Sequence, residues 1–223
     1  MSSINLGPIE SPLFQSREST RLPLREFAER TVGLLLLVIA SPAILTAALA
    51  VAMLSGRAPL VAHLRVGKHG VPFWMLKLRT MWGSDEPACE RSSAIERIIA
   101  EPADGGKNPL DSRVISGFAA FCRRHSIDEL PQLWHVVRGQ MALVGPRPLT
   151  RTEIHRYYGE QAAELLSVKP GLTGLWQVGG RSAILFPQRR ALDLELVRSL
   201  RPRIYLTILL RTLPALITGK GAW

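Results

Sequence analysis

The chain has 223 residues and a formal net charge of +10, yet its mean hydropathy is positive at +0.12. A hydrophobic share of 47% against a charged share of 21% argues against disorder, and this length is too short for a large multi-domain enzyme. A soluble nucleic-acid binder with this charge would be hydrophilic on average, so the apolar residues must be concentrated in a few segments. Cys89 and Cys122 are too few for a disulfide framework and fit no metal-ligand spacing, which favours a reducing cytoplasmic setting.

The N-terminal region combines a polar tail with a long apolar segment. Residues 1–24 mix Ser, Pro, Glu and Arg without a sustained period, which predicts a mobile tail. In the segment 25–56, the run from Thr31 to Ser55 has no charged residue and could cross a bilayer as one helix. Ser41-Pro42 interrupts this run, so the helix must bend or end there, and the Ser41 hydroxyl could satisfy a carbonyl freed at the bend.

Basic residues flank the apolar run on both sides. A spanning helix normally shows an asymmetry in positive charge, whereas matched flanks favour a re-entrant membrane helix whose two ends lie on the cytoplasmic face near anionic lipid. A kinked single-pass helix is the alternative. The flanking residues are Arg21, Arg25 and Arg30 before the run and Arg57, Arg65 and Lys68 after it.

Residues 57–223 are expected to form a cytoplasmic domain of mixed α+β structure. Short apolar runs at His63–Val66 and Val71–Leu78 predict a β-hairpin, and the polar segment 84–110 predicts a short helix followed by an exposed loop. An amphipathic C-terminal helix at Ile204–Ile217 should either pack on the core or lie in the bilayer interface. The other helices are predicted at Gly117–Arg124, Leu130–Arg138, Thr150–Leu166 and Arg189–Leu200.

Two adjacent carboxylates, Asp128 and Glu129, open a predicted helix that starts around Ser126 to Asp128. Their simplest interpretation is structural, because Ser126 and Glu129 have the spacing of a capping box and Asp128 could itself be an N-cap. A carboxylate at this place is also a competent nucleophile toward phosphorus and a hard-oxygen ligand for Mg²⁺. With arginines nearby, the pair suits phosphoryl chemistry better than glycoside hydrolysis.

Two further motifs contain residues suited to phosphate binding. Arg147 lies between Pro146 and Pro148, which restrict the backbone and fix the direction of its guanidinium for bidentate phosphate contacts. The run Lys169–Arg181 begins with a Pro-Gly turn, and its later glycines allow the backbone to approach a ligand closely. Trp176 in this run suits either base stacking or the core.

Taken together, these motifs resemble the small monotopic phosphoglycosyl transferases, the bacterial sugar transferase family. The resemblance extends from about Arg25 to Thr218. Its clearest departures from the family pattern are His135 in place of a common Asn, Gln140 in place of an acidic residue, and Asp193-Leu194 in place of Asp-Tyr. The residues that carry it are Ser41-Pro42, Lys77–Met81, Asp111–Arg113, Ser126–Leu133, Val144–Pro148 and Pro170–Arg181.

The resemblance implies a fold, a location and a reaction. The chain should be a mostly helical monotopic protein of the bacterial inner membrane, with its re-entrant hairpin bent at Ser41-Pro42. It should transfer hexose-1-phosphate from a UDP-sugar to undecaprenyl phosphate and release UMP, as the first membrane step of exopolysaccharide synthesis. Galactose and glucose are the favoured hexoses. An exposed apolar C-terminal helix would also permit a homodimer.

The resemblance also implies roles for individual residues. Asp128 would form a covalent phosphosugar intermediate and lie near Mg²⁺, and Glu129 would position or deprotonate the acceptor phosphate. Arg123, Arg147, Lys77 and Arg79 would contact substrate phosphates. The nucleotide-sugar loop would comprise Pro170, Gly171, Thr173, Gly174 and Arg181.

A membrane-anchored basic adaptor for anionic lipid or nucleic acid is the alternative from a different class. The charge of +10 favours it, but aromatic residues make up only 6% of the chain, and no nucleic-acid module is recognised. We therefore expect no nucleic-acid partner.

Overall fold

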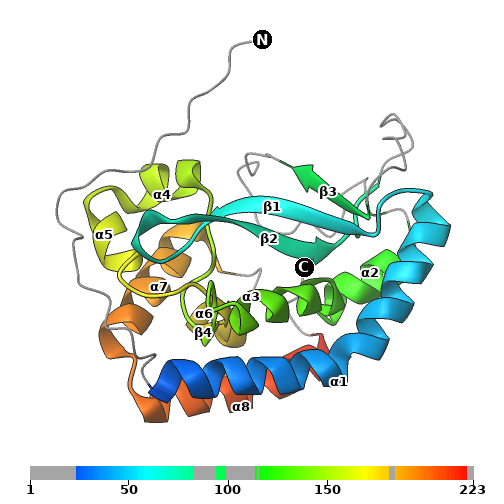
Figure 1. Cartoon of the computed structure of the whole chain (residues 1–223). Helices are drawn as coiled ribbons and strands as arrows, with labels where there is room; N and C mark the ends of the chain where they lie inside the picture. The colour runs from blue at the N-terminus through cyan, green and yellow to red at the C-terminus, as the bar shows by residue number, and fades with distance from the viewer. Residues whose placement is uncertain (1–23, 83–93, 99–113, 115, 181–183, 220–223) are drawn as a thin grey trace.

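The computed structural model describes residues 24–82, 94–98, 114, 116–180 and 184–219, so the tail expected at residues 1–24 lies almost entirely outside it. Helices dominate the described chain, as expected, and the strands form two small sheets, whereas the sequence predicts only one β-hairpin. Helices α1 and α8 run side by side along the base in Figure 1, and the larger sheet lies above them. The elements are α1 (Leu24–Ser55), β1 (Leu60–Val66), η1 (Lys68–Gly70), β2 (Pro72–Leu78), β3 (Ile95–Ile98), α2 (Gly117–Arg124), η2 (Ile127–Gln132), α3 (Leu133–Val137), β4 (Ala142–Val144), α4 (Arg151–Tyr158), η3 (Gly159–Gln161), α5 (Ala162–Leu165), β5 (Gly171–Thr173), α6 (Leu175–Gly179), α7 (Phe186–Ser199) and α8 (Pro202–Thr218).

Helix α1 keeps Ser41-Pro42 inside one continuous helix. Because Pro42 has no N–H, the carbonyl of Val38 loses its usual main-chain donor. The Ser41 hydroxyl donates to this carbonyl at 2.7 Å, which is the bond that the sequence predicts for a bend. Figure 1 shows α1 turning upward partway along its length. By length and apolar composition alone, α1 could also cross a membrane.

Both halves of α1 pack on the rest of the chain. In the first half, Gly33 lies so close to α3 that a Cβ there would come within 2.9 Å of the Val136 side chain. In the second half, Val51 is fully buried in a cluster with Trp82 and Ala119. The helix is therefore held against the described chain on either side of the proline.

The predicted β-hairpin is confirmed. Strands β1 and β2 pair antiparallel, with Leu60 opposite Leu78 at one end and Val66 opposite Pro72 at the other. Strand β3 adds to the free edge of β1 in parallel.

Strand β3 corrects the expectation for the segment 84–110. A short helix followed by a loop was predicted there, but Ile95–Ile98 forms a strand, and apart from Ala94 the rest of the segment lies outside the described residues. The β-branched isoleucines at both ends of this stretch favour a strand, and pairing with β1 satisfies its main chain. Glu96 on β3 also pairs with the buried Arg79.

The helix predicted at Gly117–Arg124 is confirmed with those bounds, and other helices are interrupted. The helix predicted at Leu130–Arg138 divides into the 3-10 helix η2, which contains Pro131, and α3. The helix predicted at Thr150–Leu166 is broken at Gly159, whose φ of 48° suits glycine. A proline removes a main-chain donor and a left-handed residue redirects the chain, which accounts for both interruptions.

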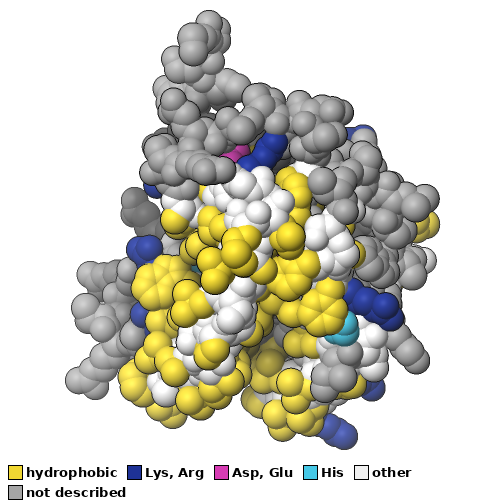
Figure 2. Space-filling view, turned by 90° about the vertical axis from the view of Figure 1, so that its right-hand side faces the viewer, with side chains coloured by type: hydrophobic (Ala, Val, Ile, Leu, Met, Phe, Trp, Pro, Cys, Tyr) yellow, Lys and Arg dark blue, Asp and Glu magenta, His cyan; other side chains and the backbone are white. Residues whose placement is uncertain are grey.

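The C-terminal helix α8 packs on the core, as one of the two interpretations of its sequence expects, and it also has an exposed apolar face. Ile208 is buried against Val144 and Leu196, so one face of α8 packs on the core. Leu206, Leu210 and Leu213 are exposed on the same helix. Figure 2 shows hydrophobic side chains gathered over the lower part of the molecule, where α1 and α8 lie in Figure 1.

A direct contact between two glycine backbones joins the motifs around Arg147 and Trp176. Strands β4 and β5 pair in parallel, and the pairing continues as Gly145 N–H donates to the Thr173 carbonyl at 2.9 Å and Gly171 N–H to the Pro146 carbonyl at 2.8 Å. A Cβ added to Gly171 would lie 2.0 Å from the Gly145 nitrogen. Only glycine permits this approach, so the spacing between the two motifs depends on it.

Gly171→Ala should therefore destabilise the folded protein by about 1–3 kcal/mol, because backbone atoms must move to admit the methyl group. The matched control is Gly179→Ala, since a Cβ there meets nothing within 4 Å. The apparent melting temperatures of both variants in detergent test this. Equal melting temperatures for the two variants would contradict it.

Candidate active site

Asp128 is buried in the first turn of η2, with 3% of its surface exposed. The predicted helix start is confirmed, because η2 begins at Ile127. The capping interpretation is wrong: Ser126 is the N-cap, and its side chain makes no capping hydrogen bond. Ser126 instead has a left-handed backbone with φ 56°, which is strained for a residue other than glycine and is typical of functional sites.

Glu129 connects the three motifs that carry charge. Its Oε1 accepts a hydrogen bond from Lys77 Nζ at 2.9 Å, and Arg147 Nη1 lies 3.9 Å from the same oxygen. Lys77 comes from β2, Glu129 from η2, and Arg147 from the loop after β4. These side chains line a small pocket together with Met75, Gln132, Pro148, Gly171, Leu172 and Gln177.

The Trp176 ring makes cation–π contacts with two arginines. Its ring is buried, and the Arg147 guanidinium carbon lies 5.5 Å from the ring centroid. The Arg189 guanidinium carbon lies 4.8 Å from the same centroid. Both arginines are partly exposed, so Trp176 serves as a core residue and as a support for two cations.

Two of the predicted phosphate-binding arginines are buried outside the pocket that contains Glu129. Arg79 donates from Nε to the Ala58 carbonyl at 2.8 Å and pairs with Glu96, so its guanidinium is engaged by the protein. Arg123 ends α2 with 5% of its surface exposed, and its Nε has no hydrogen-bond partner among the described residues. The structure therefore brings Lys77 and Arg147 to Glu129, but not Arg79.

The residues of the predicted nucleotide-sugar loop have different surroundings, and only some of them line the pocket. Gly171 lines the pocket and Pro170 accepts a main-chain hydrogen bond from Ala142, whereas the Thr173 hydroxyl bonds to Thr212 on α8 at 2.9 Å. Gly174 lies against the Gly145 carbonyl, which a Cβ would meet at 2.6 Å. Arg181 lies outside the described residues.

Asp128 is the residue that would supply a hard oxygen donor to the expected Mg²⁺. No group of three His, Cys, Asp or Glu side chains in the described ranges could hold a metal alone. Mg²⁺ is commonly bound by one or two carboxylates together with substrate phosphates. The donor set therefore fits an ion bound jointly with a phosphorylated substrate.

His135 and Gln140, which both depart from the family pattern, contact each other. The Leu76 N–H donates to His135 Nε2 at 3.0 Å, so Nδ1 carries the proton and donates to Gln140 Oε1 at 2.9 Å. Burial lowers the pKa of His135, although its bond to Gln140 opposes this. The pair thus attaches strand β2, which carries Lys77, to helix α3 beside Glu129.

Asp193 lies beneath Arg147 with 2% of its surface exposed. Its Oδ2 accepts from the Tyr158 hydroxyl at 3.0 Å, and its carboxyl also accepts from the Arg147 backbone N–H. Burial raises the pKa of Asp193 to about 7, against the lowering effect of these bonds and of the Arg147 and Arg189 charges. Sequence reasoning assigned no role to Asp193 or Arg189; their spacing of one helical turn on α7 is the signal that links them.

Asp193→Asn should stabilise the protein at about pH 8 and change it little near pH 4. The folded-state pKa of Asp193, about 7, exceeds the ordinary value of 3.8. The stability that the protonated Asp193 side chain contributes to the wild-type protein is therefore fully present below pH 3.8 and is lost as the pH rises toward 7. Asparagine does not ionise and avoids this loss. Melting temperatures across this pH range test it, with the exposed Glu195→Gln as control; a pH-independent difference from wild type would contradict it.

Comparisons with known proteins identify the family of the chain. The family model for the bacterial sugar transferases matches residues 20–219. The chain is 31% identical over 218 residues to the exopolysaccharide production protein ExoY of Rhizobium meliloti, covering 96% of each chain. It is 37% identical over 234 residues to a UDP-glucose:undecaprenyl-phosphate glucose-1-phosphate transferase of Caulobacter vibrioides, covering 99% of this chain and 81% of the relative.

A further relative is much longer than this chain. The UDP-galactose-lipid carrier transferase of Erwinia amylovora is 38% identical over 169 residues, covering 75% of this chain but 35% of that protein. The matching family model nevertheless spans almost the whole sequence printed here. The chain therefore belongs to the bacterial sugar transferase family.

Proposed function

We propose that the chain transfers hexose-1-phosphate from a UDP-sugar to undecaprenyl phosphate, releases UMP and thereby starts exopolysaccharide synthesis. The observation that carries this proposal is the meeting of Lys77, Glu129 and Arg147 in one pocket, directly after the buried Asp128 in the chain. The relatives named for undecaprenyl phosphate, UDP-glucose and UDP-galactose support the substrate classes, with galactose or glucose as the hexose.

The proposed reaction has two displacement steps at phosphorus. A carboxylate oxygen of Asp128 attacks the phosphorus that bears the sugar, the bond from this phosphorus to the bridging oxygen breaks, and UMP leaves with the electron pair. An oxygen of undecaprenyl phosphate then attacks the same phosphorus, and the Asp128 carboxylate is restored. Bound Mg²⁺ would offset negative charge on the diphosphate.

The charged residues that meet at Glu129 would position the phosphates. Arg147, fixed between two prolines, offers a guanidinium to phosphate oxygens from the pocket wall. Glu129 holds Lys77 at the same place and would accept the proton of the acceptor phosphate if it arrives protonated. The pocket thus contains both a cationic group for phosphate and a base beside it.

Asp128→Asn should lower the rate of UMP release by about 10³-fold or more, because the amide keeps the shape but removes the nucleophile. The assay uses detergent-solubilised protein, Mg²⁺, undecaprenyl phosphate and a panel of UDP-sugars that includes UDP-galactose and UDP-glucose. Omitting the acceptor should leave labelled phosphosugar on the wild-type protein and none on the variant. Glu195→Gln, on an exposed face of α7, is the control; a wild-type rate for Asp128→Asn would exclude this mechanism.

The packing of α1 supports a monotopic arrangement at the cytoplasmic face of the inner membrane. Its first half contacts α3, its second half contacts Trp82 and α2, and the Glu26 carboxylate lies 2.6 Å from Lys169 Nζ. A spanning helix would place one half beyond the membrane, away from the domain that both halves contact here. We therefore propose that α1 enters one leaflet and returns.

Single cysteines at Ser16 and at the exposed Lys68 should both react with an impermeant reagent from the cytoplasmic side. The background replaces Cys89 and Cys122 by alanine, and labelling is compared in inside-out and right-side-out vesicles. Labelling after detergent treatment controls for reactivity. If Ser16 reacts only from the opposite side to Lys68, α1 spans the membrane.

A further inference from the structure

The structure contains a second arginine beside Arg147 whose surroundings suit an anionic ligand. Arg189 lies in the first turn of α7, and its Nε donates to the Ile184 carbonyl at 2.8 Å. This bond fixes the base of the guanidinium, whose carbon lies 4.8 Å from the centroid of Trp176. The Arg147 guanidinium contacts the same ring, and its positive charge acts on Arg189.

The negative charge available to these two cations is small. Within the described part of the chain, Arg189 has no carboxylate within 4.0 Å, and Arg147 has only the Glu129 oxygen at 3.9 Å, which already accepts from Lys77 at 2.9 Å. The charges of Asp193 and Glu153 also act on Arg189, but Asp193 is buried and already accepts a hydrogen bond from the Tyr158 hydroxyl. Burial, followed by the charge of Arg147, lowers the pKa of Arg189.

We propose that Arg189 binds phosphate oxygens of a substrate together with Arg147, with Trp176 supporting both guanidinium groups. Guanidinium forks match phosphate geometry, and partly exposed arginines can reach a ligand without unfolding. A phosphate group bound by both arginines would supply the negative charge that the described residues provide only weakly there. This inference rests on the proposed phosphosugar transfer, and both the donor diphosphate and the acceptor phosphate have the required chemistry.

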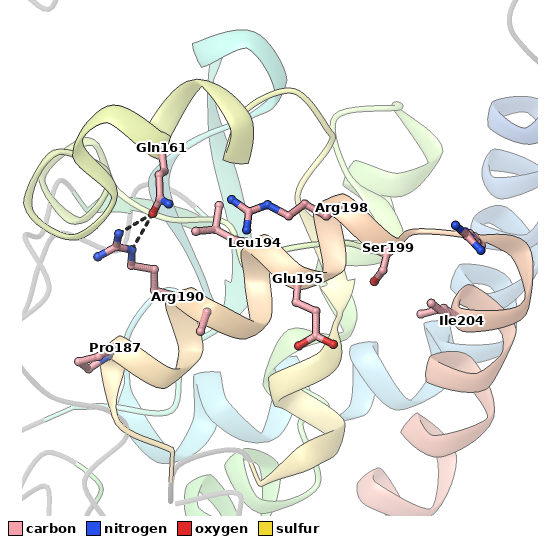
Figure 3. Close-up of a pocket in the computed structure, with 10 residues that line it drawn as sticks. Gln161, Pro187, Arg190, Leu194, Glu195, Arg198, Ser199 and Ile204 are labelled. Carbon is pink, nitrogen blue, oxygen red and sulfur yellow. Dashed lines mark hydrogen bonds between the residues drawn. The ribbon is translucent and has the colours of Figure 1, made fainter.

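The adjacent Arg190 provides a matched control on the same helix. Its Nε and Nη2 both donate to Gln161 Oε1, and Figure 3 shows these bonds on the wall of a different, open pocket of about 650 Å³. Leu194 and Arg198 line that pocket, whereas Trp176, Arg147 and Glu129 do not. Arg189 and Arg190 thus have the same charge and neighbouring positions but face different surroundings.

The kinetic test compares Arg189→Gln, Arg189→Lys and Arg190→Gln, with each substrate varied in turn. Arg189→Gln should raise the KM for one of the two substrates by about tenfold or more. Arg189→Lys should raise it by less, because lysine keeps the positive charge but loses the two parallel N–H donors of the guanidinium. Arg190→Gln should stay within about twofold of wild type. A higher KM for the UDP-sugar assigns the arginine to the donor diphosphate, and a higher KM for undecaprenyl phosphate assigns it to the acceptor.

A binding measurement separates this proposal from the proposed reaction. In the Asp128→Asn background, the Kd for UDP and for undecaprenyl phosphate in detergent is measured with and without Arg189→Gln, alongside melting temperatures. An affinity lowered by about tenfold for one ligand, without the same loss in Arg190→Gln, supports the site even if Asp128→Asn proves active. Equal affinities and KM values in the Arg189 and Arg190 variants would overturn it, as would a loss fully explained by a lower melting temperature.

Discussion

The contact between the backbones of Gly145 and Gly171 is the constraint on which the site depends. It allows β4 and β5 to pair, and this pairing places the loop of Arg147 over the segment that leads to Trp176. Glu129 and Lys77 approach from η2 and β2 on the other side of the same arginine. The close approach of Gly145 and Gly171 therefore allows charged side chains from distant parts of the chain to meet around Arg147.

Much of the fold follows from local chemistry that can be recognised in the sequence. Turn residues and short apolar runs predict the hairpin of β1 and β2, and the proline of α1 predicts both a bend and the bond from Ser41 to Val38. Strand β3 could not be predicted in this way, because its main chain is satisfied by the edge of β1, far away in sequence. The same reason applies to Arg79, whose motif suggests phosphate but whose partner Glu96 lies on that strand.

The candidate site was predictable in its residue types more than in its geometry. Asp128, Glu129 and Arg147 stand out in sequence because paired carboxylates and a proline-flanked arginine are unusual. Ser126 was misinterpreted because its spacing to Glu129 fits a capping box, whereas the fold holds its backbone in a left-handed conformation and directs Glu129 to Lys77. Arg189 belongs to no motif, and Asp193 stood out only as part of a pair that departs from the family pattern, since the importance of both arises from packing beneath Arg147 and beside Trp176.

The packing of α1 also affects how the protein can be handled. Leu37 and Ala40 cover a cluster that includes Leu133 and Met141, so the apolar helix forms one wall of the core while other leucines of the same helix are exposed. Removing it would uncover the underside of η2 and α3, the elements that carry and support Asp128 and Glu129. A fragment without α1 would thus lack a boundary of its own core and expose that apolar surface to water.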